Sequence, residues 1–236
     1  MNFAVFGRKK TFSCNWYEVA AVIFLAVIAV SYKKKNWLDL YMNRCFDQLL
    51  RAGLLFTFLD VAVRVLREYI FPGSFYVYNL SSVIPAVAMM GIAMLYFQYW
   101  HALSGHRLIL KSVRSLEMIL PAAVVTILDV TSPVTHLIFY YDRQGHYHAG
   151  SLEAIVLIVV NIYFAGACFV AFSRKTGLWI HRGISCLILC LVFDLSVVIQ
   201  FILMKNSILL MFYAMAFMIF VCLSLIHISE PTRLQL

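Results

Sequence analysis

Long apolar runs, separated by short polar or basic stretches, make up most of the chain. Each run is about as long as a bilayer-spanning helix, which takes roughly 20 residues. The predicted spans are residues 16–32, 46–66, 75–103, 109–130, 152–172, 180–203 and 207–222. The third is the longest, and we expect it to be tilted or kinked at Pro85. The pattern predicts an all-α, polytopic membrane bundle of seven transmembrane helices.

Composition supports a membrane setting. Of the 236 residues, 63% are hydrophobic and 13% charged, and the mean hydropathy is +0.87. A soluble domain has about a quarter of its residues charged, so the lipid bilayer is the expected partner of the apolar surface. The net charge of +8 does not indicate nucleic-acid binding, because the basic residues form short clusters between the runs. We expect a tail at residues 1–15 and one domain at residues 16–222.

The distribution of lysine and arginine predicts the orientation in the plasma membrane. Eleven lie in the first, third and fifth connections or beside them, and seven lie on the other side when the N-terminal tail is included. Cytoplasmic loops carry the excess of these residues, so we expect the N-terminus outside and the C-terminus in the cytoplasm. The eleven are Lys33, Lys34, Lys35, Arg44, Arg51, Arg107, Lys111, Arg114, Arg174, Lys175 and Arg182.

The connection between the fourth and fifth spans contains a hairpin signal. Leu137 to Tyr141 is apolar and aromatic, Asp142 to Gly145 has the residue types of a type I turn, and His146 to His148 returns. We therefore predict a small outer β-hairpin between helices four and five. His136, His146 and His148 with Asp142 would be an alternative metal site, but histidines in an aromatic loop are more often interfacial residues, and we expect no metal.

Polar residues inside the predicted spans are the candidates for function. Gly53, Thr57, Asp60, Arg64 and Arg67 follow spacings of 4, 3, 4 and 3, which is one helical face. A carboxylate near the bilayer centre costs roughly 2.5–3.5 kcal/mol, so this face should point into the bundle. Asp60 and Arg64 can pair with each other. The face is then either an internal ion pair that holds the bundle together or one wall of a ligand pocket.

Three further polar residues lie within later spans: Asp129, Asn161 and Asp194. With three aspartates near the single cation Arg64, at least one is protonated or paired with something from outside. Our hypothesis is an outward-opening pocket that binds a small cationic or polar ligand. Its lining would be Asp60, Arg64, Asp129, Asn161 and Asp194. The six cysteines show no CxxC pair or metal-ligand spacing, and no cofactor or catalytic residue is indicated.

The segment Ser132 to Gly150, together with Asp60 in Leu59-Asp60-Val61, resembles the membrane-embedded input regions of clostridial GGDEF proteins, the diguanylate cyclases. The likeness extends over residues 16–222. It implies seven helices with an outer hairpin, a cytoplasmic catalytic domain after the seventh, and dimerisation through that domain. Similar inputs occur on histidine kinases. No Gly-Gly-Asp-Glu-Phe motif is present in this chain.

Residues 223–233 resemble a translated sequencing adapter, so we expect residues 223–236 to be a non-native tail on a truncated reading frame. The resemblance thus implies a sensory input region that is not itself an enzyme and that signals through helix seven to an output domain, a cyclase. The alternatives are the input of a histidine kinase and a small transporter or channel.

Overall fold

The computed structural model describes residues 16–34, 41–71, 74–104, 113–142, 147–173 and 183–195. Within these residues the chain is mostly helical, with one two-stranded sheet. This confirms the predicted helical class and the hairpin between helices four and five. The expected seventh span at residues 207–222, the N-terminal tail and the adapter-like segment lie outside the described residues.

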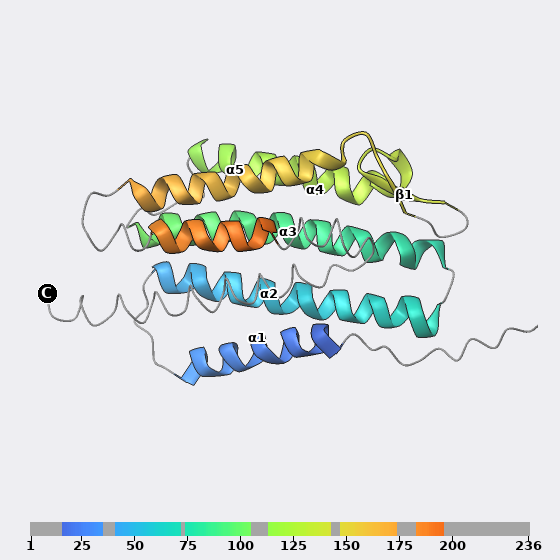
Figure 1. The fold of residues 1–236 in the computed structure, drawn as a ribbon, viewed down its shortest axis with the longest axis horizontal. Helices are drawn as coiled ribbons and strands as arrows, with labels where there is room; N and C mark the ends of the chain where they lie inside the picture. The colour runs from blue at the N-terminus through green and yellow to red at the C-terminus, as the bar shows by residue number, and fades with distance from the viewer. Residues whose placement is uncertain are drawn as a thin grey trace, which may run out of the picture.

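The helices run side by side along the long axis of the molecule (Figure 1). Helix α3 is central, because it packs against α2, α4 and α5, while α1 packs against α2. Large aromatic side chains of α3, among them Tyr96, Tyr99 and Trp100, are fully buried in the core. The helices are α1 (Trp16–Lys34), α2 (Tyr41–Val65), α3 (Phe75–Leu103), α4 (Val113–Thr135), α5 (Glu153–Phe172) and the helix Gly183–Leu195.

Three of the described helices are long and apolar enough to cross a membrane. They are α3, residues 118–135 of α4, and α5, while Val19–Tyr32 and Gly183–Leu195 are shorter apolar helices. Helix α3 has the predicted limits and runs through Pro85 without interruption. Helix α5 begins one residue after the predicted start.

Helix α2 differs from the prediction at both ends. It begins at Tyr41 rather than at residue 46, so Arg44, which we expected in a connection, lies within the helix. The early start has a packing reason, because Met42 and Cys45 are buried in the core. At its other end the helix widens into a π-helical turn, η1 (Leu66–Ile70).

Helix α4 ends at Thr135, five residues beyond the predicted end, and contains both Pro121 and Pro133. Proline lacks an amide hydrogen and disturbs the hydrogen bonds of the preceding turn. Tyr163 of α5 compensates beside Pro121: its hydroxyl accepts from the Ala122 amide at 3.2 Å and donates to the Met118 carbonyl. One side chain thus bridges two backbone groups that a regular helical hydrogen bond would join.

The hairpin consists of β1 (Phe139–Tyr141) and β2 (Tyr147–Ala149), paired antiparallel with Tyr140 opposite His148. Its turn lies outside the described residues. Gly150 closes the hairpin, and its amide donates to the Ile138 carbonyl at 2.7 Å. A Cβ atom at this position would lie 2.2 Å from the Leu137 carbonyl oxygen, so only glycine fits.

The faces of α4 are inverted relative to a helix of a soluble protein. One face is apolar and exposed, whereas the opposite face is buried and contains Asp129 and Ser132, both 0% exposed. Buried polar groups beneath an exposed apolar surface are the informative exception to ordinary burial, and a lipid environment accounts for both. The exposed face comprises Leu120, Val124, Ile127, Val130 and Val134.

Candidate functional site

The predicted polar face of α2 is buried and has an ion pair at its centre. Asp60 is 1% exposed, and its Oδ2 accepts a hydrogen bond from Nε of Arg64 at 2.9 Å. One turn earlier, the Thr57 hydroxyl donates to the Gly53 carbonyl at 2.7 Å. The four-residue spacing therefore forms the predicted pair. Asp60 Oδ1 has no hydrogen-bond partner within the described part of the chain.

Arg67 extends this charged region toward α3. It lies in the π-helical turn, donates to the Ser81 hydroxyl at 3.3 Å, and places its guanidinium 5.6 Å from the centre of the Tyr78 ring. Tyr78 in turn contacts Tyr141 of the hairpin, with 5.7 Å between ring centres. The polar face of α2 is thus linked through α3 to β1.

Asp129 is a buried carboxylate with no partner among the described residues. It is 0% exposed, and neither Oδ1 nor Oδ2 has a hydrogen-bond partner among the residues that the structure describes. Pro133, four residues later, also removes the amide that would bond the Asp129 carbonyl in a regular helix. The turn therefore presents the carboxylate and the backbone carbonyl of Asp129 as acceptors, and burying an unpaired charge here would be unfavourable. A cation or a hydrogen-bond donor bound at this turn would supply the missing partner.

Ser132, one turn after Asp129, fastens the hairpin to α4. Its hydroxyl accepts from the Ile138 and Phe139 amides at 3.1 and 2.8 Å and donates to the Phe139 carbonyl at 2.7 Å. The Tyr141 hydroxyl lies 2.6 Å from the hydroxyl of Ser82 on α3. The hairpin is therefore joined to two helices, and one joint is adjacent to Asp129.

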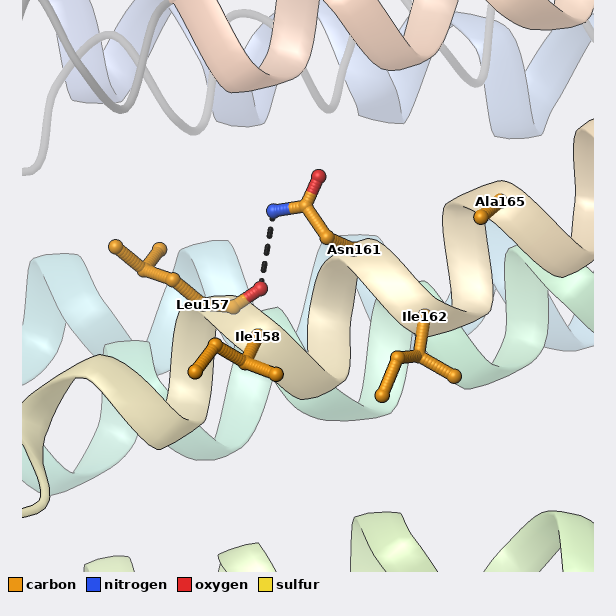
Figure 2. A pocket seen from close by; sticks show the side chains of 5 residues that line it. All are labelled: Leu157, Ile158, Asn161, Ile162 and Ala165. Carbon is orange, nitrogen blue, oxygen red and sulfur yellow. Dashed lines mark hydrogen bonds between the residues drawn. The ribbon is translucent and has the colours of Figure 1, made fainter.

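Asn161 and Asp194 form a second polar pair, between α5 and the helix Gly183–Leu195, through a side-chain hydrogen bond. The Asn161 amide also donates to the Leu157 carbonyl at 3.0 Å. Asn161 is the polar residue in a groove of about 440 Å³ along α5, and its amide points away from the helix (Figure 2). The other lining residues are Leu157, Ile158, Ile162 and Ala165.

The five predicted pocket residues thus occupy three positions. The structure pairs Asp60 with Arg64 and Asn161 with Asp194, while Asp129 lies on α4. Helix α3 packs against the helices that carry the first two positions and Asp129. Whether one ligand contacts all three remains a prediction.

The aromatic and histidine side chains of the hairpin form a stack. Tyr140 lies between His136, at 4.6 Å between ring centres, and His148, at 4.9 Å. Nε2 of His148 is 3.3 Å from Asp142 Oδ2. The Tyr140 ring therefore lies between the two histidine rings. His146, the third histidine of the alternative metal site, lies outside the described residues, so the choice between the two interpretations stays a prediction.

A cluster of three cysteine thiols was not predicted from the sequence. The thiols of Cys168, Cys186 and Cys190 lie within 4.8 Å of one another. The first comes from α5 and the other two from the helix Gly183–Leu195. The spacing of Cys186 and Cys190 places both on one helical face, but the position of Cys168 depends on how the two helices pack.

Comparison with known proteins does not assign the chain to a family. No protein-family model matches the chain, and a search of curated proteins finds no significant similarity. Functional inference therefore rests on the residues and their geometry.

Proposed function

We propose that the chain is the sensory input region of a signalling protein in the plasma membrane. Its helices cross the bilayer seven times with the N-terminus outside. The region binds a small polar or cationic extracellular ligand and passes the change through helix seven to a cytoplasmic output domain, a diguanylate cyclase. The chain itself supplies recognition rather than catalysis, and its dimerisation occurs through the output domain.

The observation that carries the proposal is the buried carboxyl group of Asp129, which has no hydrogen-bond partner in the part of the chain that the structure describes. A purely structural membrane anchor gains nothing from such a group, because burying a charge or a polar atom without a partner is unfavourable. A ligand with a positive charge or a donor supplies the missing interaction. The interaction between the ligand and Asp129 therefore contributes to the free energy of binding.

Signal transfer follows from the contacts of the hairpin. Ser132 ties β1 to α4 one turn from Asp129, and Tyr141 ties β1 to Ser82 of α3. A ligand that binds one arrangement of α4 and α3 more tightly shifts the population toward that arrangement. Because α3 packs against α2, α4 and α5, a shift of α3 reaches the whole described bundle.

The orientation is supported by the charge distribution along the chain. The connections before α2, before α4 and after α5, together with the adjoining helix segments, contain eleven of the 19 lysine and arginine residues, so we assign them to the cytoplasm. The hairpin lies at the opposite end of the bundle, beside the connection of α2 to α3 (Figure 1). With this orientation, Asp129 and the hairpin would face the outside, where an extracellular ligand arrives.

The test uses the gene in its source genome together with the coding sequence that follows it. Cyclic di-GMP is measured in cells that express wild type, Asp129→Asn or Asp47→Asn at matched protein levels. Asp47 is the control, because it forms an exposed ion pair with Arg51 at 2.6 Å. We expect Asp129→Asn to change the nucleotide level and Asp47→Asn to leave it unchanged.

Two outcomes contradict the proposal. One is an in-frame stop directly after the last codon of this chain, with no cyclase or kinase domain following. The other is a purified chain that conducts ions or moves solutes across liposomes on its own, which favours a transporter or channel.

A further inference from the structure

Three thiols from two helices meet on the side of α5 that faces the helix Gly183–Leu195. Sγ of Cys168 lies 3.8 Å from Sγ of Cys186 and 3.9 Å from Sγ of Cys190. All three sulfur atoms lie within 4.8 Å of one another, and all three cysteines are free thiols. The cluster is separate from Asp129 and from the Asp60–Arg64 pair.

These separations suit a metal ion placed between the sulfurs. For a triangle with two sides of 3.8 and 3.9 Å and a third of at most 4.8 Å, the equidistant point lies at most about 2.5 Å from each sulfur. A metal–thiolate bond is about 2.3 Å long. An ion therefore fits with almost no movement of either helix. A disulfide, by contrast, requires two sulfurs to approach to about 2.05 Å.

The surroundings restrict which ion the cluster would accept. Cys186 and Cys190 are buried at 0% and 5% exposure and belong to the same apolar core as Phe164 and Phe193. The hydroxyl of Tyr96 lies 3.5 Å from Sγ of Cys186. Sulfur supplies every member of the ligand group found among the described residues, and thiolates select soft ions.

The number of ligands distinguishes Cu(I) from Zn(II). Protein zinc sites with structural roles are almost always tetrahedral and need four ligands, whereas the ligand group found among the described residues provides three sulfurs. With Cu(I), a single thiolate beside two neutral thiols gives an uncharged complex, which suits an apolar site. Trigonal coordination of Cu(I) by three sulfurs meets both conditions.

We propose that Cys168, Cys186 and Cys190 form a three-sulfur binding site for Cu(I). On binding, copper–sulfur bonds form and each thiol that coordinates as a thiolate releases its proton to solvent. The oxidation state of copper and of sulfur does not change. The inference is independent of the proposed input function, since it rests only on the positions of the three cysteines.

The experiment compares two matched triple variants of the full chain in detergent, under anaerobic and reducing conditions. One replaces Cys168, Cys186 and Cys190 by serine. The other replaces the remaining cysteines by serine, namely Cys14, Cys45 and Cys222. Cu(I) is titrated against a competing Cu(I) chelator, bound copper is counted by elemental analysis, and copper–sulfur coordination is read from X-ray absorption.

We expect one Cu(I) per chain in wild type and in the control variant, with three sulfurs around each ion, and loss of that ion in the cluster variant. Circular dichroism establishes that both variants remain helical. If the cluster variant is not helical, the same test is made on wild type by maleimide labelling. Cu(I) should then protect Cys168, Cys186 and Cys190 from the reagent.

Equal copper binding by both triple variants would overturn the assignment, as would the absence of binding in wild type. A preference for Zn(II) over Cu(I) would overturn the choice of ion.

Discussion

The two buried aspartates, Asp60 of α2 and Asp129 of α4, are equally hidden but have different surroundings. Asp60 is 1% exposed and Asp129 is 0% exposed. Asp60 accepts a hydrogen bond from Arg64 one turn away, whereas Asp129 has no partner within the described part of the chain. The difference teaches that burial alone does not fix the role of a carboxylate: the first has its partner within the bundle, and the second is the group that we propose for ligand binding.

The largest effect that this comparison predicts is that of Arg64→Leu. The substitution removes the partner of Asp60 and leaves a buried carboxylate unpaired, which costs about 3–5 kcal/mol. We expect a corresponding loss of unfolding free energy, measured by chemical unfolding in detergent. Replacing Asp60 and Arg64 together by leucine should recover most of the loss, because no unpaired charge remains.

Arg51→Leu is the matched control for Arg64→Leu. Arg51 also pairs with an aspartate four residues earlier, but its side chain is 72% exposed. Exposed pairs contribute about 0–1 kcal/mol. Equal destabilisation by the two substitutions would show that the burial of Arg64 has no energetic significance.

A smaller effect is expected for Ser132→Ala on the α4 side of the comparison. The hydroxyl satisfies two backbone amides of the hairpin, and a buried donor left unsatisfied costs about 1–3 kcal/mol. Faster hydrogen exchange at Ile138 and Phe139 would locate the loss. Thr131→Ala is the control, because the exposed Thr131 hydroxyl donates to the Ile127 carbonyl within its own helix. The same exchange rates in both variants would contradict the role of Ser132.

Tyr163→Phe should destabilise by about 1–2 kcal/mol, because the Ala122 amide and the Met118 carbonyl beside Pro121 lose their bridge. Thermal unfolding in detergent measures the change. Tyr76→Phe serves as the control, since Tyr76 is 83% exposed. An unchanged midpoint for Tyr163→Phe would show that α4 closes its own hydrogen bond at this turn.

The sequence predicted those features that depend on local periodicity. The limits of α3 follow from an uninterrupted apolar run, and the pairing of Asp60 with Arg64 follows from a four-residue spacing. The hairpin followed from turn residues between aromatic segments. Each of these signals lies within one element, so it can be read without knowledge of packing.

Features that depend on packing between helices were not predicted. Pro133 was expected to lie beyond the fourth span, yet α4 continues through it to Thr135. Met42 and Cys45 extend α2 because their neighbours bury them. The thiol cluster joins residues 18 and 22 positions apart across two helices. No spacing rule within a single helix connects Cys168 with Cys190.

Asp129→Asn carries the smallest expected change in stability and the sharpest test of the comparison. The substitution keeps the size of the side chain and removes no hydrogen bond that the described residues make. We therefore expect an unfolding free energy within about 0.5 kcal/mol of wild type, or higher than wild type. Asp60→Asn, in contrast, loses a charge-assisted hydrogen bond from Arg64, worth about 1.5–3 kcal/mol.

Both variants replace a buried carboxylate by an amide. The difference between their unfolding free energies therefore reports the contribution of the hydrogen-bond partner within the protein. Chemical unfolding of both in the same detergent measures it. If Asp129→Asn were as destabilising as Asp60→Asn, Asp129 would have a partner within the protein and would be structural. A stable Asp129→Asn variant whose cyclic di-GMP level differs from wild type would instead separate recognition from folding, because the group that binds the ligand contributes nothing to the stability of the bundle.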